Sequence, residues 1–92
     1  MAFDPSASGD AVQRSVLAIL ARIAGPNRTP ADPGPATLLA EGGFWLDSID
    51  LLDLVLECDA AFGPVFERAP ASAIGALRAV GDLVAFIEGA RD

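Results

Sequence analysis

Two of the three Gly-Pro pairs in the 92-residue sequence, at 25–26 and 63–64, divide it into stretches that can be helical and stretches that cannot. Proline interrupts helices and glycine is common just after their last turn, so the pairs at 25–26 and 63–64 should each end a helix. Before each pair, apolar side chains recur at helical spacing, and no long alternation of polar and apolar residues marks a strand. The sequence therefore predicts an all-α protein.

The expected helices fit one small domain, because a chain of this length has room for a single compact core. Ser8 or Asp10 would cap the first helix, and Pro70 would lie in the first turn of a short third helix. Residues 1–8 are expected to form a flexible tail and residues 9–92 the domain. The predicted helices span residues 9–24, 48–62, 71–77 and 80–89, a four-helix bundle with three main helices and one short one.

The connection between the first two helices is long, and residues 25–35 contain four prolines. A single turn could form from Ala36 to Glu41 and end at Gly42-Gly43. A connection of more than about 20 residues is unusual in a compact domain and often has a functional or family-specific reason.

The charge is concentrated in one part of the chain. Thirteen acids oppose six arginines, with no lysine or histidine, which gives a net charge of −7. Residues 41–62 hold six acids and no base, hence −6, and the other residues hold seven acids and six bases, hence −1. Binding to nucleic acid or to an anionic membrane is not expected, since both need basic side chains. Basic protein partners are the better expectation.

Several classes of function lack the residues that they require. One cysteine and no histidine cannot build a zinc site or a Cys/His or Ser/His nucleophile system, and no phosphate-binding glycine loop is present. The acids are spaced as on a helix, not as in a calcium-binding loop. We therefore expect neither an enzyme nor a metal site. Cys58 cannot form an internal disulfide, and neither a membrane span nor a signal peptide is evident, so a cytoplasmic protein is expected. We also expect a monomer.

The helix predicted over residues 48–62 has three faces at 100° per residue. The first is an apolar arc suited to the core, made of Leu51, Leu54, Val55, Cys58 and Phe62. The second is an acidic ridge made of Asp50, Asp53 and Glu57. The third is another apolar stripe made of Ile49, Leu52 and Leu56. The stripe and the ridge together suit docking of a partner with basic groups around an apolar spot. Alternatively, the acids form an ordinary solvated face and Leu52 packs on the long loop.

Ser48 begins this helix, and two interpretations remain open for it. It can be an ordinary N-cap whose hydroxyl accepts a backbone N–H. It can also be a modification site, since the unpaired N–H groups and partial positive charge of a helix start would stabilise a phosphodiester. Trp45, shortly before it, is expected to pack against the bundle, and Cys58 is expected to be an inert core residue.

Residues 46–63, from Leu46-Asp47-Ser48-Ile49 to Phe62-Gly63, resemble the acyl carrier protein family. That family has an Asp-Ser-(Leu/Ile) motif, then an acidic helix of the same periodicity, then Phe-Gly. Residues 77–87, with Val80-Gly81-Asp82-Leu83-Val84 at their centre, are similar to the family's last helix. The first helix and the long loop agree with the family in length and placement only.

The resemblance implies that Ser48, bordered by Asp47, is esterified by 4′-phosphopantetheine taken from coenzyme A. A separate phosphopantetheinyl transferase would catalyse this step and supply the base. The arm's thiol would then hold acyl groups as thioesters. The same resemblance implies a surface read by the transferase, by an acyl-loading ligase or acyltransferase, and by ketosynthase-type enzymes. That surface would comprise Ile49, Asp50, Leu52, Asp53, Leu56 and Glu57.

Leu46 stands where many carriers of fatty acid biosynthesis have glycine. The Leu-Asp-Ser form, preceded by Gly43-Phe44-Trp45, looks more like free-standing carriers of bacterial secondary metabolism, such as polyketide or antibiotic biosynthesis. Two alternatives are an aminoacyl or D-alanyl-type carrier, and a carrier-like adaptor that binds proteins without a prosthetic group. The sequence names neither the cargo nor the pathway.

Overall fold

The computed structural model describes residues 5–69 and 72–91, with side-chain surroundings given for residues 11–69 and 72–90. These residues form four helices: α1 (Pro5–Ala24), α2 (Ser48–Phe62), α3 (Ser72–Gly75) and α4 (Val80–Arg91). No strand forms within the described ranges, and the β-type pairing seen there is an isolated bridge between Leu38 and Ala79. The predicted all-α class, with three main helices and one short one, is confirmed.

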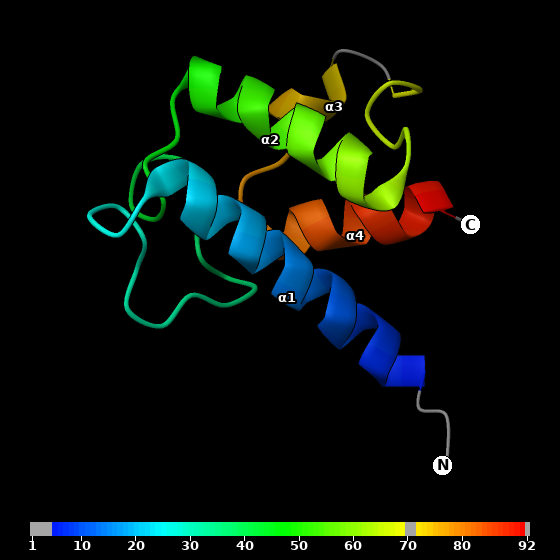
Figure 1. Ribbon diagram of the computed structural model, residues 1–92, viewed down its shortest axis with the longest axis horizontal. Coiled ribbons are helices and arrows are strands. Elements are labelled where there is room, and N and C mark those ends of the chain that lie inside the picture. The colour runs from blue at the N-terminus through cyan, green and yellow to red at the C-terminus, as the bar shows by residue number, and fades with distance from the viewer. Residues whose placement is uncertain (1–4, 70–71, 92) are drawn as a thin grey trace.

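Helix α1 packs against both other long helices. In Figure 1 it runs diagonally across the molecule, with α2 and α4 both on its upper right side and α4 between α1 and α2 in this view. Its C-terminal end lies on the same side of the molecule as the start of α2, and the long connection folds back beneath both. This arrangement brings the loop after α1 close to the first turn of α2.

Three of the expected helix boundaries differ from the structure. Helix α1 begins at Pro5, so residues 5–8 are helical and the predicted caps Ser8 and Asp10 are wrong. Proline is favoured in the first turn of a helix, because its missing N–H would have no helical partner there. Helix α3 is shorter than the predicted 71–77, and α4 continues two residues past Gly89. Residues 1–4 and 70–71, which include Pro70, lie outside the described residues. The bounds of α2 are confirmed.

The core lies between the three long helices and takes side chains from the connections as well. Within the described residues its most buried large side chains are Phe44, Leu20, Leu54, Leu83, Ile87, Val16, Val80 and Cys58. Phe66 and Phe86 stack with ring centroids 4.7 Å apart, which ties the loop after α2 to α4. Within α2, Leu54 and Cys58 are buried, and Leu51, Val55 and Phe62 are partly buried against the core. The predicted core face of this helix is confirmed.

The long connection is irregular but well anchored. The predicted turn from Ala36 to Glu41 does not form as a helix. Instead the loop pairs with the start of α4: Gly81 N–H donates to the Pro35 carbonyl (2.8 Å), and Val80 N–H donates to the Thr37 carbonyl (2.9 Å). These bonds satisfy two N–H groups of the first turn of α4, which have no carbonyl partner within the helix. The segment before α2 is therefore held in place.

Gly43 lies at a close backbone approach inside this connection. A Cβ at this position would overlap the Leu38 carbonyl oxygen and would lie 2.6 Å from its carbonyl carbon. The Phe44 N–H donates to the same Leu38 carbonyl at 3.0 Å. The absence of a side chain at residue 43 therefore allows the tight crossing that places Phe44 in the core.

Across the described residues, no helix has the length and hydropathy needed to cross a membrane.

Candidate attachment site and docking surface on α2

The start of α2 is capped by Asp47, not by Ser48. The Asp50 N–H donates to Asp47 Oδ1 at 2.9 Å, and the Asp47 N–H donates to Asp50 Oδ2 at 3.2 Å. This reciprocal pair is a capping box, in which each carboxylate satisfies a backbone donor at the helix start. The interpretation of Ser48 as the N-cap is wrong, because Asp47 has the extended backbone that a cap needs and Ser48 is already helical.

Ser48 is left exposed as the first residue of the helix. Within the described residues its hydroxyl has no hydrogen-bond partner, since the cap hydrogen bond is made by Asp47 instead. A serine at this position is free to react with an incoming group. The helix start also favours negative charge placed near it, through its partial positive charge and unpaired N–H groups.

Arg28, in the proline-rich connection, reaches this helix start. Its Nη1 donates to Asp50 Oδ2 at 2.7 Å and to the Trp45 carbonyl at 3.2 Å. Its Nε donates to the Ala24 carbonyl at 3.0 Å and its Nη2 to the Ile23 carbonyl at 3.2 Å. One guanidinium therefore joins the last carbonyls of α1 to the first turn of α2.

The two partners shift each other's titration. The side-chain hydrogen bond from Arg28 is the main reason that the pKa of Asp50 lies below its ordinary 3.8, and the Asp47 N–H contributes further. Conversely, the hydrogen bond to Asp50 raises the pKa of Arg28 above its ordinary value, although desolvation acts in the opposite direction. Asp50 is therefore ionised and Arg28 charged at neutral pH.

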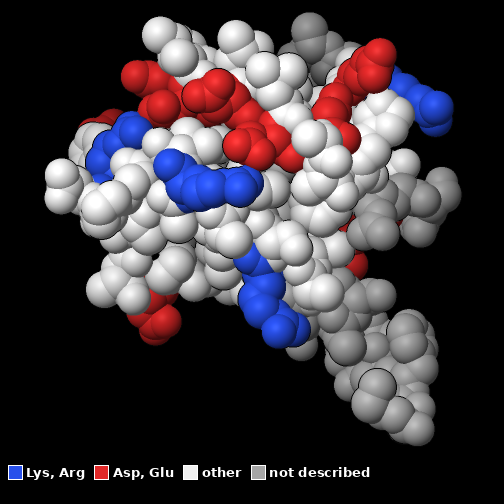
Figure 2. Space-filling view, viewed as in Figure 1, with Lys and Arg blue, Asp and Glu red and all other residues white. Residues whose placement is uncertain are grey.

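The acidic ridge is not free of compensating bases, contrary to expectation. Arg22 Nη2 lies 3.1 Å from Glu57 Oε1, and Arg28 pairs with Asp50. Asp53 is exposed, with no ion pair among the described residues. In Figure 2 acidic side chains gather over α2, and basic side chains lie beside them along the border with α1. The helix wheel could not show these pairs, because both arginines come from outside the helix.

The second apolar stripe is exposed as the docking interpretation requires. Ile49 is 72%, Leu52 61% and Leu56 62% accessible. Leu52 does not pack on the long loop, so that alternative is wrong. The three side chains lie at i, i+3 and i+7, hence along one face of α2. Aligned large apolar side chains in contact with water are unfavourable, and such exposed patches mark surfaces that bind a partner.

Trp45 is 55% exposed, and the expectation that it packs against the bundle is wrong. Its neighbours Phe44 and Leu46 are buried, so the side chain between them points outward. Its backbone has a positive φ of 57°, unusual for a bulky residue, and is held by hydrogen bonds from its N–H to the Ala40 carbonyl and from Arg28 to its own carbonyl. The sequence offered no signal of this, because all three residues are large and apolar.

Cys58 is a buried residue of the core, as predicted. Burial is the main cause that raises the pKa of its thiol to about 12, and the nearby Asp59 and Glu57 add to the shift. The thiol is therefore protonated at neutral pH and a poor nucleophile.

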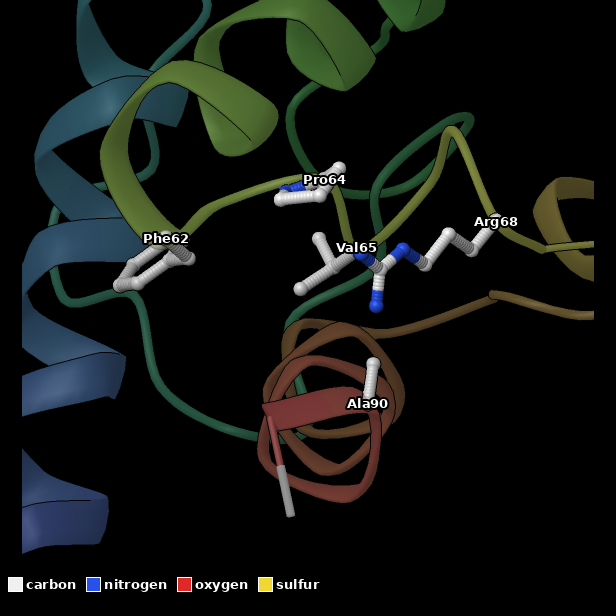
Figure 3. A pocket seen from close by; sticks show the side chains of 5 residues that line it. All are labelled: Phe62, Pro64, Val65, Arg68 and Ala90. Carbon is white, nitrogen blue, oxygen red and sulfur yellow. The ribbon is translucent and has the colours of Figure 1, made fainter.

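A hollow of about 260 Å³ lies at the far end of α2, lined by Phe62, Pro64, Val65, Arg68 and Ala90 (Figure 3). The length of α2 separates it from Ser48 by about 20 Å. No group of three or more metal-ligating side chains occurs among the residues that the structure describes.

Comparisons with protein-family models, with curated proteins and with solved structures gave no match for this chain.

Proposed function

We propose that this chain is an acyl carrier whose attachment point is Ser48. The observation that carries the proposal is the exposed Ser48 hydroxyl, released from capping by Asp47, at the start of a helix that bears an acidic and apolar outer face. The sequence resemblance over residues 46–63 supports the same function.

The residues present fit 4′-phosphopantetheine. Ser48 offers an accessible oxygen for a phosphodiester, and the helix start lies where its negative charge is favourable. Asp47 borders the site and keeps its carboxylate engaged with the Asp50 N–H. When attached, the arm supplies a terminal thiol that carries acyl groups as thioesters. The chain needs no base of its own, because the transferase that loads it can accept the serine proton.

The partner surface in this proposal is the outer face of α2. Its apolar anchors are Ile49, Leu52 and Leu56, and its free carboxylate is Asp53. Asp50 and Glu57, also expected there, are each paired with an arginine of this chain. We therefore propose that the transferase, an acyl-loading ligase or acyltransferase, and ketosynthase-type enzymes read this face mainly through apolar contact.

The biological setting belongs to the same proposal. A cytoplasmic, monomeric carrier of bacterial secondary metabolism, as in polyketide biosynthesis, agrees with the Leu-Asp-Ser form of the motif and with a cysteine kept as a buried thiol. The carrier needs no catalytic residues, because its partners supply the chemistry.

The second candidate is an adaptor that uses the exposed stripe of α2 without a prosthetic group. The specific observation in its favour is the exposed apolar stripe of Ile49, Leu52 and Leu56, a docking surface to which Ser48 contributes nothing. An aminoacyl or D-alanyl carrier would share the arm of the leading proposal and differ in the cargo.

The deciding experiment is incubation with coenzyme A, magnesium and a broad-specificity transferase, followed by intact mass measurement. We expect one phosphopantetheine to be added. The chain has no lysine, and no arginine lies between Arg28 and Arg68. Trypsin therefore cleaves after these two residues and releases the peptide 29–68, in which Ser48 is the one serine.

The added mass should lie on that peptide and should be abolished by Ser48→Ala. Ser72→Ala is the matched control, since Ser72 is also an exposed first residue of a helix. An unchanged wild-type mass would reject the carrier and leave the adaptor.

A further inference from the structure

The guanidinium of Arg28 contacts three segments that meet at the start of α2. Four of its N–H···O contacts lie between 2.7 and 3.2 Å: two to carbonyls at the end of α1, one to the Trp45 carbonyl and one to the Asp50 carboxylate. The guanidinium plane is suited to this task, because it presents five donors in a fixed geometry.

Two of these contacts bracket Ser48 along the chain. The Trp45 carbonyl lies three residues before it, and Asp50 lies two residues after it. Asp50 Oδ2 also accepts the Asp47 N–H, so one carboxylate oxygen serves both the capping box and Arg28. The Arg28 side chain therefore links the backbone on both sides of Ser48 to the end of α1.

A second ion pair with an arginine lies further along α2. Arg22 and Glu57 also join α1 to α2, at 3.1 Å, but their side chains are 66% and 43% exposed. Those of Arg28 and Asp50 are 36% and 15% exposed. Arg22 makes no hydrogen bond to the segment before α2 among the described residues. An exposed pair of this kind contributes little and is screened by salt.

We propose that Arg28 is a positioning residue for Ser48: it fixes the first turn of α2 and the preceding segment in the geometry in which the serine is presented to the loading enzyme. This proposal rests on the proposed carrier function for its enzymatic part. Its structural part concerns this chain alone and is measured separately.

The experiment compares Arg28→Gln, Arg28→Lys and Arg22→Gln with the wild type. Both glutamine variants remove one positive charge and break one ion pair to α2, so they differ in their hydrogen bonds to the start of α2. Amide exchange reports on the Trp45 and Asp50 N–H groups, which donate to the Ala40 carbonyl and to Asp47 Oδ1. The Gly63 N–H, which donates to the Asp59 carbonyl at the other end of α2, is the internal reference.

We expect exchange at Trp45 and Asp50 to become about tenfold faster in Arg28→Gln and to change by less than about twofold in Arg22→Gln. Gly63 should exchange at the wild-type rate in all variants. In the loading reaction the apparent KM for the Arg28→Gln carrier should rise by about tenfold with kcat little changed, because the transferase must first order the serine. Arg28→Lys keeps the positive charge but loses the planar set of guanidinium donors. Its exchange rates and its KM should therefore lie between those of Arg28→Gln and the wild type.

Equal exchange at Trp45 and Asp50 in the two glutamine variants would overturn the proposal, as would equal loading kinetics of the two. If Arg28→Gln does not fold, Arg28→Lys decides in its place, and wild-type behaviour of that variant in both measurements overturns the proposal. If the wild type itself takes up no phosphopantetheine, the carrier function fails, and exchange alone decides whether Arg28 fixes the start of α2.

Discussion

Arg28 lies 2.7 Å from Asp50, across 22 residues of sequence that include most of the connection between α1 and α2. The pair sets how the end of α1 meets the start of α2 and neutralises one of the acids on the outer face of α2. Arg28 also donates hydrogen bonds to three backbone carbonyls. The position of Ser48 therefore depends on a residue 20 positions earlier, outside the helix that Ser48 begins.

Asp47 should matter for folding, and Ser48 should not. Asp47→Ala removes the N-cap acceptor and should lower the free energy of unfolding by about 1 kcal/mol, whereas Asp47→Asn should keep most of it. Ser48→Ala should change it by less than about 0.5 kcal/mol, because the hydroxyl makes no hydrogen bond within the described residues. Urea unfolding followed by circular dichroism measures all three. A larger loss for Ser48→Ala than for Asp47→Ala would contradict the assigned cap.

The Arg28–Asp50 contact should make stability depend on acid pH. The folded-state pKa of Asp50 lies below the 3.8 of a free carboxyl group, so its contribution is present above about pH 4 and is lost as the pH falls through the folded value. The difference in urea midpoint between wild type and Asp50→Asn should therefore be positive at pH 7 and shrink as the pH falls below about 4.

Asp53→Asn is the matched control, since it removes the same charge from an exposed position on the same helix. Its midpoint should stay close to that of the wild type across the range. A constant difference between wild type and Asp50→Asn down to pH 3 would show that the Asp50 charge contributes nothing to folding.

Alanine substitutions at buried Leu54 and exposed Leu56 should distinguish an effect on folding from an effect on partner binding. Leu54 is 2% exposed, and Leu54→Ala should cost about 2–5 kcal/mol of stability. Leu56→Ala, at an exposed position, should change stability by less than about 0.5 kcal/mol and leave the helical circular dichroism intact. If the outer face docks partner enzymes, Leu56→Ala and Asp53→Arg should still lower turnover by those enzymes, by about tenfold. Unfolding by Leu56→Ala would instead place that residue in the core.

Gly43 should be intolerant of any side chain. Gly43→Ala forces a Cβ into the Leu38 carbonyl and should destabilise the fold by about 2–3 kcal/mol through displacement of Phe44 from the core. Gly34→Ala in the same connection is the control, because a Cβ there meets nothing within 4 Å. Thermal unfolding of the two variants compares them, and equal melting temperatures would contradict the close approach.

Much of α2 could be predicted from its own residues. Its two ends and its buried face follow from a local stop signal and from the 100° repeat, and both agree with the structure. The start of α1 could not be placed in this way, because proline and small residues before Gly9 are compatible with either a tail or a first turn. The exposure of Trp45 could not be predicted, because its hydropathy favours burial. Its side chain points outward because the backbone places Phe44 and Leu46, on either side of it, in the core.

The sequence by itself determined the helical class, the three faces of α2 and the place of Ser48 at its start, because these depend on spacing along one helix. The tertiary structure alone decided that Arg22 and Arg28 neutralise Glu57 and Asp50, and that Trp45 is exposed. Those outcomes depend on hydrogen bonds and ion pairs between segments brought together by packing, and short-range periodicity carries no information about such partners.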